Sequence, residues 1–330
     1  MKALVYTGPE SLEIRDVLPP SHKAGEVPVR VESAGICGSD MHAFLGHDER
    51  RPAPLILGHE VAGVAEMPDG SRQRVTINPL VTCGTCRACK AGQDNLCPER
   101  QIISMPPREG GFAEWVALPE RNLVAVPDHI SPDQAALAEP IACGWHAARI
   151  ARAHPAGARD GARALVFGGG AIGLGAALSL MAQGITDVRL VEPNLARARY
   201  LSERCGVTVI KAEAATQRHY DVIVDGVGIA PTRAAASAAA RPGGIIVHIG
   251  LGSSEGGLDI RRMTLQEITF TGTYTYTAQD FRDCAQAMFD GRLGPLDWVE
   301  RRPLSEGASA FADIRAGRTA APKIILKPDA

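Results

Sequence analysis

At residues 164–173 the sequence reads ALVFGGGAIG, and these ten residues are the clearest indication of the fold. A short apolar run leads into the glycines, and Leu174–Ala182, which is rich in small residues, follows them with the pattern of a helix. The glycines fit the spacing G-x-G-x-x-G at Gly168, Gly170 and Gly173. The first allows a tight turn, the second lets the backbone approach a pyrophosphate, and the third lets the helix pack closely on the strand. The stretch therefore predicts a dinucleotide-binding turn at a helix N-terminus.

A carboxylate follows at the position that selects between dinucleotides. The second strand, Val188–Val191, ends at Glu192, about 20 residues beyond the last glycine, where an acid accepts hydrogen bonds from the adenosine ribose and repels a 2′-phosphate. This favours NAD. Two alternatives stay open: Glu192 as an ordinary surface acid, and NADP as the cofactor, because Arg197 and Arg199 lie on the following segment.

The regions on either side of this motif differ in their pattern of predicted helices and strands. From about Ile141 the chain alternates Ala-rich helical segments with buried strands, read as Ala164–Phe167, Val188–Val191, Val222–Asp225 and Ile245–Ile249. This alternation predicts an α/β domain, a doubly wound parallel sheet covered on both faces.

The first 140 residues instead contain short strands separated by Pro and Gly. These strands are Val27–Ser33, Val61–Glu66, Arg74–Asn78, Ala113–Ala117 and Leu123–Val126. They predict a partly open β-barrel. The last sixty residues or so return to mixed segments and end in an apolar strand, Lys323–Leu326.

Composition limits the functions to consider. Of 330 residues, 45% are hydrophobic and 22% charged, which indicates a folded globular protein. A net charge of −2 gives no field that attracts nucleic acid or an anionic membrane. The uncharged stretch 164–182 is divided by glycines, so we read it as strand, turn and helix and not as a membrane span. We find no signal peptide at the N-terminus and expect a cytoplasmic protein.

Four of the eight cysteines are crowded together. Cys83, Cys86 and Cys89 are spaced at intervals of three, and Cys97 follows. Four thiolates complete a closed tetrahedral site, which predicts a structural zinc. Four incidental buried cysteines are the alternative, and a nucleic-acid-binding zinc ribbon is disfavoured because the second Cys-x-x-Cys knuckle and the basic surface are missing.

A second, dispersed set of possible ligands lies nearby in the sequence. Cys37-Gly38-Ser39-Asp40-Met41-His42 combines a thiol, a hydroxyl, an acid and an imidazole. Gly58-His59-Glu60 adds an imidazole and a carboxylate between two hydrophobic runs. Either fragment alone is ordinary, because a histidine beside an apolar strand is more often a core residue than a ligand.

Together with Ala138-Glu139-Pro140, these motifs occur in an order that resembles the medium-chain zinc alcohol dehydrogenases, and the third fragment resembles the sorbitol (polyol) dehydrogenase branch. The resemblance runs the whole length of the chain. It implies a GroES-like catalytic domain from residues 1–140 and 272–330, which carries the structural zinc loop 83–97. It also implies a Rossmann NAD-binding domain from residues 141–271.

Carried over by motif, the resemblance implies that Cys37, His59 and Glu139 hold a catalytic zinc with one open position. Glu60 would lie beside the metal, as an alternating ligand or behind the ligands. Ser39 would accept the substrate proton and pass it through the cofactor ribose to His42. The reaction implied is hydride transfer from a secondary alcohol of a polyol or sugar-like substrate to NAD, giving a ketone.

The remaining expectations also come from the resemblance. Cys143 resembles the nicotinamide contact, and we place Ile172, Ile249 and Leu251 in the cofactor site. Expected substrate contacts are Phe44, His47, Phe112 and Tyr274. Threonine or a simple secondary alcohol is the alternative substrate, and a non-catalytic NAD-binding protein is the alternative class. We expect a homodimer or homotetramer.

Overall fold

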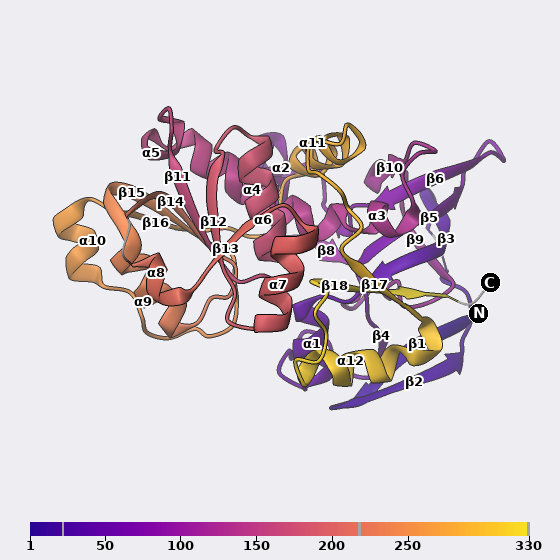
Figure 1. The fold of residues 1–330 in the computed structure, drawn as a ribbon. Coiled ribbons are helices and arrows are strands. Elements are labelled where there is room, and N and C mark those ends of the chain that lie inside the picture. Colours follow the sequence, from indigo (N-terminus) through magenta and orange to yellow (C-terminus); the bar gives the residue numbers. More distant parts are fainter. Residues whose placement is uncertain (22, 217–218, 329–330) are drawn as a thin grey trace. The chain divides into compact units, whose positions relative to one another are not determined.

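The computed structural model describes residues 1–21, 23–216 and 219–328, which form two compact units (Figure 1). Unit 1 comprises Met1–Glu139, Thr277–Phe289 and the described part of Val299–Ala330; unit 2 comprises Pro140–Tyr276 and Asp290–Trp298. We expected a single return to the catalytic domain, at 271/272. The chain instead leaves unit 2 after Tyr276 and enters it a second time at Asp290–Trp298. The segment Asp290–Trp298 belongs there because it packs on it: the Arg292 guanidinium lies 5.6 Å from the centre of the Trp145 ring.

Unit 1 is built on a seven-stranded sheet, with β10-β6-β5-β3-β18-β17 in order and β9 paired to β3. Its strands are β3 (Glu26–Gly35), β5 (Glu60–Glu66), β6 (Arg72–Ile77), β9 (Trp115–Pro119), β10 (Leu123–Ala125), β17 (Val299–Pro303) and β18 (Lys323–Lys327). Two smaller sheets are β2-β1-β4 and β7-β8. They contain β1 (Lys2–Gly8), β2 (Ser11–Asp16), β4 (Leu55–Ile56), β7 (Leu80–Val81) and β8 (Gln101–Ile102).

Alternation of side chains explains the central strand of this sheet. In β3 the side chains of Val27, Val29 and Val31 are buried, whereas Arg30 between them is exposed. This period of two places one face of the strand in the core. Near its end β3 pairs antiparallel with β18, Gly35 opposite Ile325. The two ends of the chain are thus joined in one sheet.

Short helices complete unit 1. They are α1 (Gly38–Phe44), α2 (Arg87–Lys90), α3 (Pro132–Ala136), α11 (Ala278–Phe289) and α12 (Gly307–Arg315), with 3-10 turns η1 (Asp94–Leu96), η2 (Glu120–Asn122) and η3 (Leu304–Glu306). Helices α1 and α12 lie side by side in Figure 1, and the rings of Phe44 and Phe311 are 5.2 Å apart. The ring of Phe112 meets Phe311 edge-on at 6.1 Å, so these three aromatic residues belong to one core.

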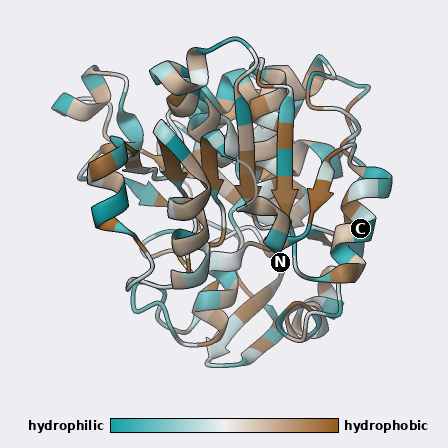
Figure 2. Cartoon of the chain, turned by 60° about the vertical axis from the view of Figure 1, so that its left-hand side comes forward, coloured by the Kyte–Doolittle hydropathy of each residue, from teal (hydrophilic) through white to brown (hydrophobic). Residues whose placement is uncertain are grey.

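Unit 2 contains a six-stranded sheet in the order β13-β12-β11-β14-β15-β16, and every adjacent pair is parallel. The strands are β11 (Arg163–Phe167), β12 (Asp187–Val191), β13 (Thr208–Ile210), β14 (Tyr220–Asp225), β15 (Ala240–His248) and β16 (Thr269–Gly272). In Figure 2 the strands near the centre of the view are largely brown, as expected for a sheet buried on both faces. Strand order reverses between β11 and β14, and ligands of such sheets bind at the carboxyl ends of the strands beside this reversal.

The helices of unit 2 are α4 (Ala138–Ala153), whose first two residues belong to unit 1, and α5 (Pro155–Ala158), α6 (Ala171–Ala182), α7 (Leu195–Arg204), α8 (Ala212–Ala215), α9 (Ala230–Ala239) and α10 (Ile260–Gln266). Helix α6 begins at Ala171, three residues earlier than expected, because Gly170 serves as its N-cap. Among the described residues, no helix is long and apolar enough to cross a membrane. The two-part fold class predicted from the sequence is confirmed.

Candidate functional site

The glycine turn has the shape that a pyrophosphate requires. Gly168 has φ +95°, a conformation that side chains disfavour, and a Cβ on Gly173 would lie 1.8 Å from the carbonyl oxygen of Gly168. Gly170 caps α6 without a side-chain hydrogen bond, and a Cβ there would meet open space. The first amides of α6 therefore face an open position at the reversal of strand order, where they suit the phosphates of a dinucleotide.

Glu192 lies against this turn. Its Oε2 accepts a hydrogen bond from the amide of Gly169 at 2.9 Å, and its Oε1 accepts one from the amide of Asn194 at 2.7 Å. The backbone thus holds the carboxylate at the carboxyl end of β12, beside the glycines. This is the place where an acid meets the adenosine ribose in dinucleotide-binding sheets.

Other expected cofactor residues lie in the same unit. The amides of Ile249 and Gly250 both donate to the carbonyl of Asp225 at 3.0 Å, which fixes the loop after β15 beside the end of β14. Leu251 in this loop is 78% exposed. Ile172 is half-buried in the first turn of α6, and Cys143 is buried in α4. The cofactor roles of these four residues stay predictions.

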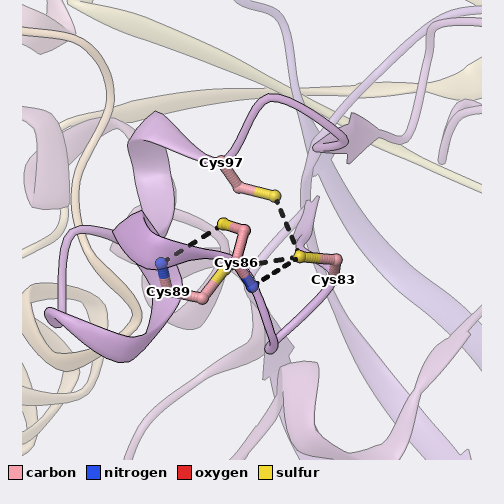
Figure 3. Close-up of side chains that lie close together, drawn as sticks. All are labelled: Cys83, Cys86, Cys89 and Cys97. Carbon is pink, nitrogen blue, oxygen red and sulfur yellow. Dashed lines mark hydrogen bonds between the residues drawn. The ribbon is translucent and has the colours of Figure 1, made fainter.

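The four clustered cysteines converge on one point (Figure 3). The sulfur of Cys83 lies 3.5 Å from that of Cys97 and 3.9 Å from that of Cys89, and all four sulfurs are within 4.8 Å of one another. Zinc–sulfur bonds of about 2.3 Å in a tetrahedron place the sulfurs about 3.8 Å apart, whereas a disulfide would bring two to about 2.0 Å. All eight cysteines are free. The cluster therefore fits a tetrahedral zinc.

The backbone around Cys83 favours its thiolate form. The amides of Thr85 and Cys86 hold the pKa of the Cys83 thiol at about 6. Since thiolate is the form that binds metal, Cys83 is prepared as a ligand at neutral pH. The amides of Cys86 and Cys89 also point at the sulfurs of Cys83 and Cys86, at 3.4 and 3.5 Å.

A second group of possible ligands lies where β3 ends and β5 begins. The ligand atoms of Cys37, His59 and Glu60 are within 4.8 Å of one another. Cys37 is the N-cap of α1, and Glu60 pairs with Gly35 across the antiparallel strands β3 and β5, which explains why distant residues meet here. Thiolate, imidazole and carboxylate are donors that zinc binds.

The ring of His59 is oriented for metal binding. Its Nδ1 lies 3.3 Å from Oδ1 of Asp40 and 3.4 Å from Oγ of Ser104, which leaves Nε2 for the metal. Burial disfavours the charged imidazole, but Asp40 and Cys37 outweigh it and raise the pKa of His59 well above its usual value. Burial also opposes the charge of Asp40, but His59 and Arg51 keep the pKa of that carboxyl below its usual value.

Glu60 has two unlike carboxylate oxygens. Oε1 accepts a hydrogen bond from Nζ of Lys323 at 2.5 Å, and this ammonium also donates to the carbonyl of Ile36 at 2.7 Å. Oε2 is buried and has no hydrogen-bond partner among the described residues. A Cβ on Gly35 would lie 2.0 Å from Oε2, so a side chain there would displace the carboxylate. A buried carboxylate oxygen without a partner is costly, and a cation beside it would remove that cost.

Sequence reasoning missed Lys323, which we had taken only as the start of an apolar strand. Burial opposes its charge, but Glu60, Cys37 and Glu139 raise the pKa of Lys323 above its usual value. The one available signal was a lysine next to Ile-Ile-Leu, since a lysine in a buried strand needs an acidic partner. No pattern in the sequence indicates that this partner is Glu60.

Glu139 is not in the group formed by Cys37, His59 and Glu60. It is buried in the first turn of α4. Its negative charge contributes to the raised pKa of Lys323. The pKa of the Cys284 thiol is also raised, first by burial, then by the charge of Asp280 and then by that of Glu139. Its role as third zinc ligand therefore stays a prediction, and Glu60 competes for that role.

The expected proton-relay residues lie on α1, with Ser39 half-buried and His42 exposed one turn later. Among the expected substrate contacts, His47 is exposed and Tyr274 is half-buried. The other two lie in the core of unit 1. Phe112 is 0% exposed and Phe44 is also buried, and both pack on Phe311. Both were expected at the substrate from the family resemblance, and this role stays a prediction.

A parallel sheet with a dinucleotide turn, a closed four-sulfur site and an open set of Cys, His and Glu define a zinc- and nicotinamide-dependent dehydrogenase. Residues 23–128 match the family model of the alcohol dehydrogenase GroES-like domain, and residues 171–290 match that of zinc-binding dehydrogenases. The chain is 30% identical to sorbitol dehydrogenase of Arabidopsis thaliana, over 89% of this chain and 86% of that protein.

It is also 30% identical to L-idonate 5-dehydrogenase of Vitis vinifera, over 82% of this chain and 78% of that protein. Among solved structures, a thermostable alcohol dehydrogenase from Pyrobaculum aerophilum superposes with a TM-score of 0.88 at 26% identity, over 99% of both chains. The chain belongs to the zinc-dependent medium-chain alcohol dehydrogenases, on their polyol dehydrogenase-like branch. The family, the enzyme class and the cofactor types predicted from the sequence are confirmed.

Proposed function

We propose that the enzyme oxidises a secondary hydroxyl of a polyol or sugar-like substrate to a ketone and transfers the hydride to NAD. The observation that carries this proposal is the group of half-buried Cys37 with buried His59 and Glu60, in which one carboxylate oxygen has no partner among the described residues. The names of the relatives support the substrate class, since they include dehydrogenases of sorbitol and L-idonate.

When bound, zinc supplies a Lewis acid that lowers the pKa of a hydroxyl, and NAD supplies the hydride acceptor. The chain would hold the metal through Cys37 and His59, with Glu139 or Glu60 as the third ligand. Ser39 accepts the proton of the substrate hydroxyl. His42, exposed and three residues on along α1, delivers that proton to solvent.

Glu192 supports NAD over NADP, because its carboxylate is held beside the glycine turn and repels a 2′-phosphate. We propose that unit 1 is the catalytic domain and that unit 2 is the cofactor domain. The free thiols, which a zinc site requires, support a cytoplasmic location.

We propose that the enzyme associates as a homodimer or homotetramer through unit 2. Strand β16 is an edge of the parallel sheet, and α10 beside it exposes Ile260 and Leu265. An open strand edge with neighbouring exposed apolar side chains favours pairing with a second chain. Light scattering at several protein concentrations tests this state.

A substrate panel tests the function. The purified enzyme with NAD is offered polyols such as sorbitol and xylitol, sugar acids such as L-idonate and L-galactonate, then threonine and propan-2-ol, and NADH formation is followed. We expect the highest kcat/KM with a polyol or sugar acid. A clear preference for threonine or propan-2-ol would contradict the proposed substrate class. NAD binding without turnover of any alcohol would support the non-catalytic alternative.

A further inference from the structure

Arg51 is a buried arginine at the edge of the Cys37, His59 and Glu60 group, and no expectation from the sequence includes it. It is 3% exposed. Its NH1 donates to the carbonyl of Ser39 at 3.0 Å and to Oδ2 of Asp48 at 2.9 Å. Its Nε donates to the carbonyl of Ser104 at 2.9 Å. One guanidinium thus joins three separate segments.

The Ser104 contact reaches the metal site through the histidine. Ser104 is fully buried, and its Oγ lies 3.4 Å from Nδ1 of His59. Its φ is +67°, a conformation that a residue with a Cβ keeps only when its surroundings enforce it. The hydrogen bond from Arg51 to the Ser104 carbonyl is a contact that enforces it, and so it fixes where the hydroxyl meets the imidazole.

The Ser39 contact reaches the same site from the other side. Ser39 stands in the first turn of α1, between Cys37 and Asp40. Asp40 binds the amide of Cys37 at 2.9 Å and lies 3.3 Å from the His59 ring. Arg51 donates a hydrogen bond to the carbonyl of Ser39, which lies between Cys37 and Asp40 in the sequence. This contact fixes the first turn of α1, which carries the expected metal ligand Cys37 and the expected proton acceptor Ser39.

We propose that Arg51 is a positioning residue that sets the orientation of His59 toward the metal and of Ser39 toward the substrate. The proposal rests on the proposed function for the role of Ser39, but its His59 part needs only metal binding. A lysine cannot replace Arg51, because a single ammonium lacks the planar fork that reaches two carbonyl groups at once. Groups that orient a metal-bound histidine typically contribute about 10–100-fold in activity or metal affinity.

The test compares Arg51→Lys and Arg51→Met with the parent enzyme, each loaded with cobalt in place of catalytic zinc. We expect a changed cobalt d–d absorption spectrum, faster loss of the metal to a chelator, and a kcat about 10–100-fold lower in both variants. KM for NAD should stay the same. The cobalt spectrum and the metal loss require no substrate, so a wrong substrate class leaves this part of the test intact.

Arg302→Met is the matched control, because Arg302 is a mostly buried arginine of unit 1 that pairs with Glu300 and Asp313 on β17 and α12. It should lower the melting temperature without changing the cobalt spectrum. If Arg51→Met does not fold, Arg51→Lys decides. A folded Arg51→Lys with the parent spectrum, metal retention and kcat would overturn the proposal, as would an equal spectral change in Arg302→Met.

Discussion

At the scale of single residues, the two carboxylate oxygens of Glu60 have different surroundings, which makes Glu60 a candidate for the third metal ligand. One oxygen binds Lys323 and the other has no partner among the described residues, beside Cys37 and His59. Glu60 can therefore keep its ion pair and still offer an oxygen to a cation. Glu139 stands apart from this group but acts electrostatically on the same lysine.

Metal content of Glu139→Ala and Glu60→Ala, measured side by side, identifies the third ligand. If Glu139 binds zinc, Glu139→Ala should lose one zinc and its activity should fall by orders of magnitude while NAD binding persists. Glu139→Cys should keep the metal, because a thiolate is a zinc ligand of the same charge. Two zincs and near-normal turnover in Glu139→Ala, with one zinc lost in Glu60→Ala, would assign the ligand to Glu60.

Glu192 is the single residue expected to select between NAD and NADP. NAD should have a much higher kcat/KM than NADP, because Glu192 accepts from ribose hydroxyls and repels a 2′-phosphate. Glu192→Ala should lower the ratio of the two kcat/KM values, because NAD loses its ribose contact and the 2′-phosphate of NADP is no longer repelled. Glu213→Ala, which removes an exposed acid of α8 in the same unit, should leave the ratio unchanged. Equal efficiency of the parent enzyme with both cofactors contradicts the prediction.

At the scale of elements, the four-cysteine loop is anchored to a distant helix. Asp94 in η1 accepts a hydrogen bond from the amide of Ala278 at 3.1 Å, at the start of α11. Helix α11 in turn packs on the start of α4, where the Cys284 thiol faces the carbonyl of Ala138. A metal in the loop therefore stabilises unit 1 through contacts outside the loop as well as within it.

Cys86→Ser should lose one zinc and lower the melting temperature or solubility, because three sulfurs hold the loop less firmly. Dehydrogenase activity should survive in the fraction that stays folded, since the loop ligands do not include Cys37 or His59. Cys205→Ser, at a buried cysteine outside both groups, should retain both zincs. Complete inactivity of Cys86→Ser at an unchanged melting temperature would show that the loop has a catalytic role.

At the scale of the whole molecule, unit 1 is assembled from both ends of the chain, and Asp133 joins them. Its Oδ1 accepts from Ser33 of β3 and from Lys327 of β18, each at 2.6 Å, and its Oδ2 accepts from Arg301 of β17 at 2.5 Å. Burial raises the pKa of Asp133, but these three partners outweigh it and hold that pKa below its usual value.

The free energy of unfolding should therefore depend on Asp133 in acid. A carboxyl whose pKa is lowered on folding stabilises the fold above its unfolded pKa of about 3.9 and loses this as pH falls through its folded pKa. Asp133→Asn should destabilise unit 1 at pH 7 by about 1–3 kcal/mol and flatten the acid limb of the stability curve. Asp128→Asn, at a fully exposed acid, is the control and should change neither in denaturant titrations. An unchanged acid limb in Asp133→Asn would refute this role.

The features that could be predicted from the sequence are local ones. The glycine turn and the four-cysteine loop depend on residues close together in the chain, where backbone sterics and ligand spacing leave few alternatives. Most strands of both sheets were predicted to within a few residues, because side-chain alternation and apolar runs are also local signals. The short strands β13, β16 and β17 were not predicted. The fragments around Cys37 and His59 are also local, but their roles as ligands were implied only by the family resemblance.

Tertiary structure alone decided which distant residues meet. The Glu60–Lys323 pair exists because β18 joins β3 beside β5, and no pattern within one segment encodes that register. Arg51 reaches Ser39 and Ser104 for the same reason. Phe44 and Phe112, which the family resemblance placed at the substrate, pack on Phe311 in the core, and no pattern in the sequence indicates this packing. The return of Asp290–Trp298 to unit 2 also depends on a long-range contact with Trp145, because packing partners are chosen by the assembled surface and not by spacing along the chain.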